Sequence, residues 1–160
     1  MKRRFTLAAL IAISAPLLAD ESAEREAVLG VIDAFFESMT ARNVDRMRTL
    51  MTPDGIIYGY REDEEGVQVI RPTHADYLDN LATGEARLVE RYWDPEIMVY
   101  GRLATIWTPY DLYADGEYSH CGVNNFSLLK TAAGWVITGV VFSIEAECAP
   151  SPLGPFEDNR

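Results

Sequence analysis

The chain has few of the residues on which the most recognisable enzyme sites depend. Of its 160 residues only two are histidines, His74 and His120, and only two are cysteines, Cys121 and Cys148. Protein zinc sites use spaced sets of His and Cys ligands, and this sequence has no pair at that spacing. It also lacks a Gly-x-Ser-x-Gly motif, a phosphate-binding glycine loop and a Cys-x-x-Cys motif. We therefore expect no metal and no cofactor.

Positive charge is scarce as well. Lys and Arg together number 14 against 25 Asp and Glu, which gives a formal net charge of −11. Phosphate backbones and anionic lipid surfaces repel a chain of this charge. Nucleic acid and membrane surfaces are therefore not expected partners.

The N-terminus has the layout of a secretory signal peptide. Met1–Arg4 is basic, Phe5–Leu18 is apolar, and Ala19 offers a small residue for cleavage. The apolar run is shorter than the roughly 20 residues that span a bilayer, which favours a cleaved peptide over a retained anchor. We expect residues 1–19 to be removed and the protein to be periplasmic or secreted, by either Sec or twin-arginine export. One domain then covers residues 20–148, followed by a proline-rich tail over residues 149–160.

Hydrophobic periodicity predicts helices and then a run of strands. The helices are expected at 23–40, 44–51 and 73–81, with His74 facing solvent. Asn43 can cap the second helix, and Thr73 with Asp76 comes close to a capping box for the third. Short strands are expected at 56–60, after a turn at Asp54-Gly55, and at 67–71, 86–93 and 97–100. Three longer strands follow at 103–113, 118–129 and 135–145, and Asp115-Gly116 is a strong hairpin signal between the first two. Helices grouped against an antiparallel sheet predict an α+β domain. A strongly curved sheet of this kind encloses a cone, whose open end is a ready pocket.

The chain resembles the nuclear-transport-factor-2-like superfamily, which includes ketosteroid isomerase and the SnoaL-like cyclases, and within it the lumazine-binding group of small bacterial proteins. The resemblance implies a cone-shaped, cystatin-like α+β barrel with helices on the concave face of the sheet, and often a homodimer packed sheet to sheet. It rests on 31–36, Glu90–Pro95, Leu103-Ala104, Trp107, Pro109–Asp111, Asp115-Gly116, Ser119–Gly122, Phe126 and Gly134-Trp135.

The position of the hairpin turn predicts the strand register, and with it which side chains lie on the same face of the sheet. A two-residue turn at Asp115-Gly116 pairs Tyr113 with Tyr118, and then Asp111 with His120 and Trp107 with Asn124. A bulge at Pro109 would shift the register of the first strand. The expected ligand contacts are Trp107, Asn124, Tyr110, Phe126 and Tyr58.

Two functions from different classes fit this pattern. The first is an exported, non-catalytic domain that binds a small, partly aromatic molecule. The second is a cofactor-free lyase or isomerase, in which His120 moves a proton and Asp111 orients it. Asp111 and His120 could also simply satisfy each other across the hairpin.

The cysteines leave two possibilities open, one disulfide or two separate buried thiols. Export favours a disulfide. A straight third strand, however, would place Cys148 roughly 13 Å from Cys121, whereas a disulfide needs Cα atoms within about 7 Å. A bond between them therefore requires the chain to bend back after Ile144.

Overall fold

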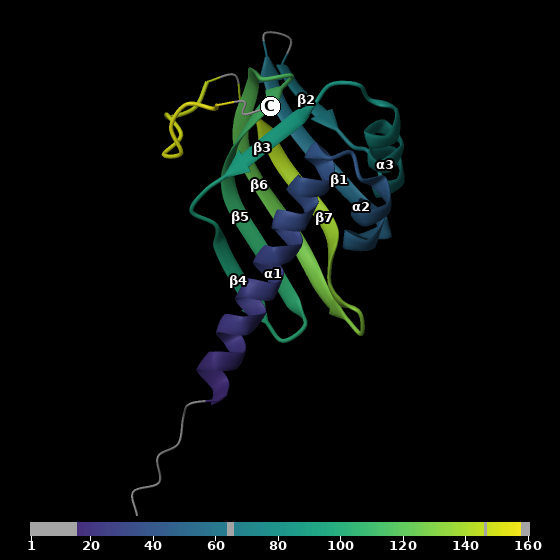
Figure 1. Ribbon diagram of the computed structural model, residues 1–160, viewed down its shortest axis with the longest axis vertical. Coiled ribbons are helices and arrows are strands. Elements are labelled where there is room, and N and C mark those ends of the chain that lie inside the picture. The colour runs from purple at the N-terminus through teal and green to yellow at the C-terminus, as the bar shows by residue number, and fades with distance from the viewer. Residues whose placement is uncertain (1–15, 64–65, 146, 158–160) are drawn as a thin grey trace, which may run out of the picture.

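A curved sheet with helices on its concave face makes up the protein (Figure 1). The computed structural model describes residues 16–63, 66–145 and 147–157. Within them lie three helices, α1 (Pro16–Thr40), α2 (Val44–Leu50) and α3 (His74–Thr83). The strands are β1 (Met51–Asp63), β2 (Gly66–Ile70), β3 (Leu88–Tyr92), β4 (Glu96–Tyr100), β5 (Leu103–Ala114), β6 (Glu117–Thr131) and β7 (Gly134–Ile144). The predicted α+β class is confirmed.

The seven strands form one open sheet in the order β2-β1-β7-β6-β5-β3, and β4 extends it by pairing with β5. All the pairs are antiparallel except β1 with β7, which run parallel. The three long strands β5, β6 and β7 are the predicted meander. Because sheets twist in one sense, long strands of this kind curl and leave one concave face to be covered. In Figure 1, α1 crosses that face diagonally.

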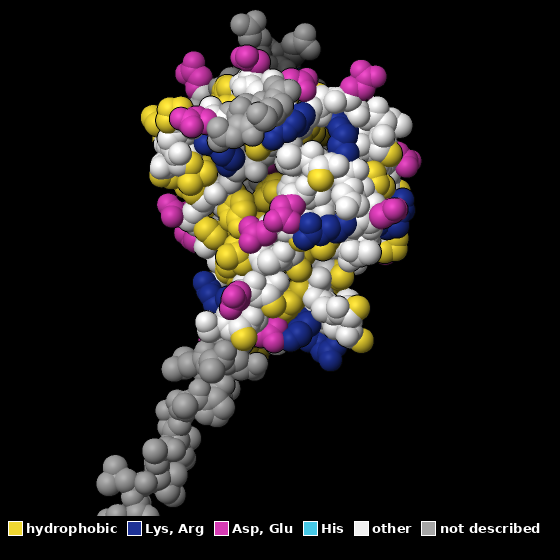
Figure 2. All heavy atoms as spheres, in the orientation of Figure 1, with side chains coloured by type: hydrophobic (Ala, Val, Ile, Leu, Met, Phe, Trp, Pro, Cys, Tyr) yellow, Lys and Arg dark blue, Asp and Glu magenta, His cyan; other side chains and the backbone are white. Residues whose placement is uncertain are grey.

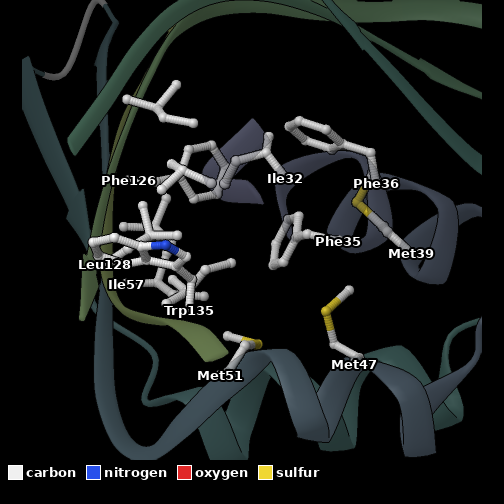
Figure 3. Close-up of a cluster of buried hydrophobic side chains, with 14 of the residues drawn as sticks. Ile32, Phe35, Phe36, Met39, Met47, Met51, Ile57, Phe126, Leu128 and Trp135 are labelled. Atoms are coloured by element: carbon white, nitrogen blue, oxygen red, sulfur yellow. The ribbon is translucent and has the colours of Figure 1, made fainter. Parts of the chain in front are cut away.

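Aromatic packing holds α1 on the sheet. Phe35 and Phe36 both meet Phe126 of β6 edge to face, with ring centroids 5.5 and 5.9 Å apart. These rings lie in the main buried cluster, and Figure 3 shows Phe35 and Phe36 extending from the helix towards the strand that carries Phe126. Edge-to-face pairs add roughly 0.5–1.5 kcal/mol each beyond the area that they bury. The N-terminal part of α1 is tied down separately, where Glu24 pairs with Lys130 and accepts from Trp135 Nε1 at 2.9 Å.

The other two helices begin at the expected caps. The Asn43 side chain accepts from the Arg46 amide at 3.0 Å to start α2. Thr73 and Asp76 form the predicted capping box of α3. The first helix differs, since it starts at Pro16 and not near Ala23. Of the predicted signal peptide, residues 1–15 lie outside the described residues and residues 16–19 lie in the first turns of α1.

Two β-bulges correct the expected register. Tyr113 does pair with Tyr118, but the next pair is Leu112 with His120, so Ser119 is an extra residue in β6. Each bulge moves the side chains beyond it to the other face of the sheet. Asp111 therefore lies opposite Cys121, and Trp107 lies opposite Asn125. A second bulge at Thr138 of β7 places Val140 on the concave face and leaves Val141 on the convex one. The anticipated bulge at Pro109 is absent from this pairing.

His74 was expected to face solvent and is instead completely buried. Its Nδ1 lies 2.6 Å from the carbonyl oxygen of Thr52, and its Nε2 has no hydrogen-bond partner. The ring lies against Gly55, where an added Cβ would approach Cε1 to 2.0 Å. Asp54-Gly55 lies within β1 and does not form the predicted turn. Glycine is needed at position 55 because any side chain there would collide with the His74 ring. Burial lowers the pKa of His74.

This burial predicts a pH-dependent loss of stability. A base whose pKa is lowered by folding binds protons more readily when unfolded, so its contribution to stability is complete above pH 6.5 and falls as the pH drops below it. We expect the free energy of unfolding of the wild type to decrease from pH 7 to pH 5 relative to that of His74→Gln, which cannot titrate. Urea denaturation of both proteins at each pH measures this difference. Parallel pH profiles would show that His74 is not buried in its neutral form.

Candidate functional site

A cavity of about 210 Å³ lies between α1, α3 and the concave face of the sheet. Aromatic rings and aliphatic side chains make most of its wall, and four groups can hydrogen-bond within it. The apolar lining includes Phe35, Phe36, Met39, Tyr110, Phe126, Val140, Phe142 and Ile144, and the polar groups belong to Tyr77, Glu90, His120 and Asn124. An apolar cavity with a few converging polar groups is the usual form of a small-molecule site.

Glu90 is the most unusual of these groups. It comes from the half-buried strand β3, its side chain lines the cavity, and its Oε1 accepts a hydrogen bond from Asn124 Nδ2 at 2.6 Å. Burial raises the pKa of Glu90 to about 8, the hydrogen bond from Asn124 opposes that rise, and the charge of Asp111 adds to it. The carboxyl therefore carries a proton at neutral pH. A protonated carboxyl can donate a hydrogen bond or a proton to a molecule in the cavity.

Three other polar side chains line the same cavity. The hydroxyl of Tyr77 on α3 is buried without a hydrogen-bond partner, and burial is the main cause that raises its pKa. Tyr110 of β5 donates to the carbonyl of Ser143 at 2.7 Å, and its ring meets that of His120 edge to face. Burial lowers the pKa of His120, which keeps its imidazole neutral near pH 7. An unpaired buried hydroxyl is costly, so Tyr77 is a group that a bound molecule could satisfy.

The structure does not bring Asp111 and His120 together. Asp111 lies on the convex face, where Arg91 binds its carboxylate through Nε at 2.9 Å and Nη2 at 2.5 Å. The bulge at Ser119 causes this separation, because it turns His120 inwards while Asp111 points outwards. Arg91 also donates to the carbonyl of Gly154 at 3.1 Å, so the ion pair helps to seat the C-terminal tail. The proposed His120–Asp111 dyad is therefore wrong, and of the two only His120 lines the cavity.

The other predicted contacts divide in the same way. Asn124, Phe126 and Tyr110 line the cavity as expected. Trp107 and Tyr58 do not, because both lie on the convex face and are 43% and 39% exposed.

Cys121 and Cys148 form a disulfide, with their Cα atoms 6.2 Å apart. The bridge between Cys121 and Glu145 continues the register of β6 with β7. Because Cys148 is bonded to the same residue that pairs with Glu145, the chain bends back after Glu145, one residue later than the bond was expected to require. The disulfide joins the convex face to the start of the tail, where Phe156 stacks on Tyr113 with ring centroids 4.4 Å apart. Among the described residues no group of His, Cys, Asp or Glu could hold a metal ion.

Sequence reasoning missed Glu90 and Tyr77. Glu90 lies in the half-buried strand Leu88–Tyr92, next to Arg91. In the sequence, adjacent acidic and basic residues suggest an ion pair and not a residue that faces a cavity. Alternation along the strand separates the two, so that Arg91 reaches the convex face and Glu90 the cavity. The one available signal was that Glu90 begins the Glu90–Pro95 stretch of the family resemblance. Nothing in the sequence places Tyr77 against it.

Residues 28–147 match the family described as the SnoaL-like domain. The chain belongs to the SnoaL-like domain family. It is thereby a member of the nuclear-transport-factor-2-like superfamily, as the resemblance implied. No curated protein matches the sequence.

Solved structures share the fold at low sequence identity. A nuclear-transport-factor-2-like protein from Salmonella enterica serovar Typhimurium is 17% identical with a TM-score of 0.64, and the match covers 82% of this chain and 98% of that one. A candidate dehydratase of the same family from Streptomyces avermitilis is 16% identical with a TM-score of 0.63, covering 78% and 98%. A protein with a cystatin-like fold from Novosphingobium aromaticivorans is 15% identical with a TM-score of 0.61, covering 82% and 88%. At these identities the likeness concerns the fold alone.

On the side that carries α1, acidic side chains lie along the helix, and apolar side chains show between it and the neighbouring strands of this SnoaL-like domain (Figure 2). No helix in the described ranges is long and apolar enough to cross a membrane.

The enclosed carboxyl of Glu90 predicts a second pH effect, opposite in sign to that of His74. A carboxyl whose pKa is raised by folding stabilises the protein at low pH and loses that contribution as the pH rises towards its folded pKa of about 8. We expect the stability of the wild type to fall relative to that of Glu90→Gln by up to about 1.4 kcal/mol per pH unit between pH 5 and pH 8. Chemical denaturation of both proteins across this range checks the difference, and a constant gap would contradict an enclosed, protonated Glu90.

Proposed function

We propose that this SnoaL-like domain is an exported protein that binds a small, partly aromatic molecule in the cavity on its concave face. The observation that carries the proposal is the buried, unpartnered hydroxyl of Tyr77 beside the protonated carboxyl of Glu90 in an otherwise apolar cavity. Such groups are costly in a cavity that serves only packing. A ligand that hydrogen-bonds with them would remove that cost.

Two features support export. The first 19 residues have the signal-peptide layout, and the disulfide between Cys121 and Cys148 is of the kind that persists in oxidising compartments such as the periplasm. We accordingly propose a periplasmic or secreted location after cleavage at Ala19.

A second candidate function is a cofactor-free lyase or isomerase, of the dehydratase or cyclase type. It is favoured by the pKa of Glu90, which at about 8 lets the carboxyl give or take a proton near neutral pH. His120 is a neutral imidazole on the same cavity and can serve as the partner base. The Streptomyces avermitilis structure, a candidate dehydratase, has this fold. In this reading Glu90 takes the part that Asp111 was expected to play.

Ligand binding and catalysis can be told apart with two variants. We expect a screen of small aromatic compounds, lumazine-type heterocycles included, to shift the NMR signals of Asn124 and Phe126. Val140→Phe, which fills the cavity from its wall, should abolish those shifts. Glu90→Gln should leave binding of neutral compounds within a few-fold of the wild type. Turnover of a bound compound that stops in Glu90→Gln would establish the enzyme, and shifts that persist in Val140→Phe would contradict the proposed site.

We also propose that the protein is a homodimer that associates through the convex face of the sheet. That face exposes a group of large apolar side chains from five strands, namely Tyr58, Met98, Tyr100, Leu103, Trp107, Leu129 and Val141. Soluble monomers rarely expose contiguous apolar patches of this kind. A second copy would cover them, because a two-fold axis lets the same patch face itself.

The dimer is tested with charge placed in the centre of this patch. We expect sedimentation equilibrium of the mature chain to give twice its mass, and Trp107→Lys to give the single mass. Trp107 is 43% exposed and does not line the cavity, so the fold should tolerate the change. A wild type that sediments as a monomer at 100 μM would contradict the proposal.

A further inference from the structure

The cavity holds a carboxyl group but no positive side chain to pair with it. Among its lining residues Glu90 is the only Asp, Glu, Lys or Arg. Resting on the proposed binding function, we propose that the ligand is a small organic cation, with an ammonium group that pairs with Glu90 and an apolar body that fills the rest of the cavity. The proposal concerns the class of ligand and not its identity.

Aromatic rings surround the position that such a cation would take. Six of them line the cavity, from Phe35, Phe36, Tyr77, Tyr110, Phe126 and Phe142. The face of an aromatic ring attracts a cation by roughly 0.5–2 kcal/mol, and more when water is excluded. Figure 3 shows Phe35, Phe36 and Phe126 converging with Met39 on the same interior space. A wall of rings around one carboxyl is the usual composition of an ammonium site.

The polar groups also suit an ammonium group, which has three N–H donors and no acceptor. Asn124 Nδ2 occupies only Oε1 of Glu90, so Oε2 can accept from a ligand. The buried hydroxyl of Tyr77 has no partner and can accept a second hydrogen bond. The Asn124 side-chain oxygen can accept a third. These groups come from β3, α3 and β6, and they face one cavity.

Among the described residues, the charged and titratable groups near Glu90 provide no positive side chain to pair with its carboxylate. Asp111 on β5 adds negative charge, and His120 on β6 is neutral near pH 7. On α1, Asp33 and Glu37 line a neighbouring groove that also reaches Glu90 and that Arg91 lines as well. The two nearby arginines are engaged elsewhere. Arg91 binds Asp111 on the convex face, and Arg42 donates to the carbonyls of Leu81 and Ala86. An anionic ligand would find no cation among the residues that line this cavity to pair with.

Binding of a cation must move a proton. Glu90 is protonated at pH 7, and the ammonium group favours its ionised form, so the carboxyl proton leaves to solvent as the ion pair forms. Affinity for the cation should therefore rise about tenfold per pH unit up to the pKa of Glu90, about 8, and then level off. At still lower pH, protonation of His120 would weaken binding further, although burial lowers the pKa of this imidazole. A neutral ligand that hydrogen-bonds to the protonated carboxyl would show neither effect.

Three probes of one shape test this selection. The cavity of about 210 Å³ is below the roughly 300–1,000 Å³ of drug-sized sites, so single-ring compounds are suitable: 2-phenylethylamine, 2-phenylethanol and phenylacetate. We expect titration calorimetry of the mature wild type at pH 7 to show the amine binding at least tenfold more tightly than the alcohol, and no binding of the acid. Repeating the amine titration in buffers of different ionisation enthalpy should show close to one proton released.

Glu90→Gln is the matched variant, because an amide keeps the volume and the hydrogen bond from Asn124 while it cannot ionise. It should lose the tenfold preference for the amine over the alcohol and release no proton. The wild-type proton count needs no variant and decides the matter even if this variant fails to fold. Binding of the alcohol equal to or tighter than that of the amine would overturn the cation and leave the binding function standing. No binding by amine, alcohol or any compound of the aromatic screen would overturn both.

Discussion

The packing of Phe35 and Phe36 of α1 against Phe126 of β6 holds the helix across the concave face of the sheet. The rest of the site depends on this contact. With α1 in place, its side chains Phe35, Phe36 and Met39 form the helical wall of the cavity between helix and sheet. Phe35 continues the stack to Tyr77 on α3, with ring centroids 5.7 Å apart, so the second helix is positioned by the same side chain. Enclosure by these rings is what makes the carboxyl of Glu90 retain its proton.

Alternation along β3 and the bulge at Ser119 sort the charged residues between the two faces. Glu90 and Arg91 are neighbours in sequence but point in opposite directions, one into the cavity and one to Asp111 and the tail. Arg91 consequently stabilises the convex face, where the disulfide and the stacking of Phe156 on Tyr113 also hold residues 148–156. The cavity keeps its uncompensated carboxyl because the nearest arginine on the same strand is used elsewhere. This division explains how one short strand contributes both to the cavity and to the stability of the convex face.

The element types, the capping of α2 and α3, the hairpin at Asp115-Gly116 and the family followed from the sequence, because they depend on local propensity and periodicity. The sequence did not predict which side chains of β5 and β7 point to the concave face. One extra residue, at Ser119 or at Thr138, moves every side chain beyond it to the other face, and no residue type marks such a bulge. Because of that reversal, Asp111 and Trp107 were expected on the cavity side but lie on the convex face. Asn124 and Phe126 were expected on the cavity side and do line the cavity. His74 was misjudged for a related reason, as its burial depends on the glycine at position 55 of a distant strand.

The proposed site depends on Glu90 being a neutral acid at neutral pH within an aromatic cavity. An NMR titration of its side-chain carboxyl carbon, in protein labelled with carbon-13 glutamate and assigned by comparison with Glu90→Gln, tests this directly. We expect a midpoint near pH 8 for this one signal, while exposed glutamates titrate near pH 4.3. A midpoint below pH 5 would show instead that the carboxyl is ionised and solvated in the folded protein.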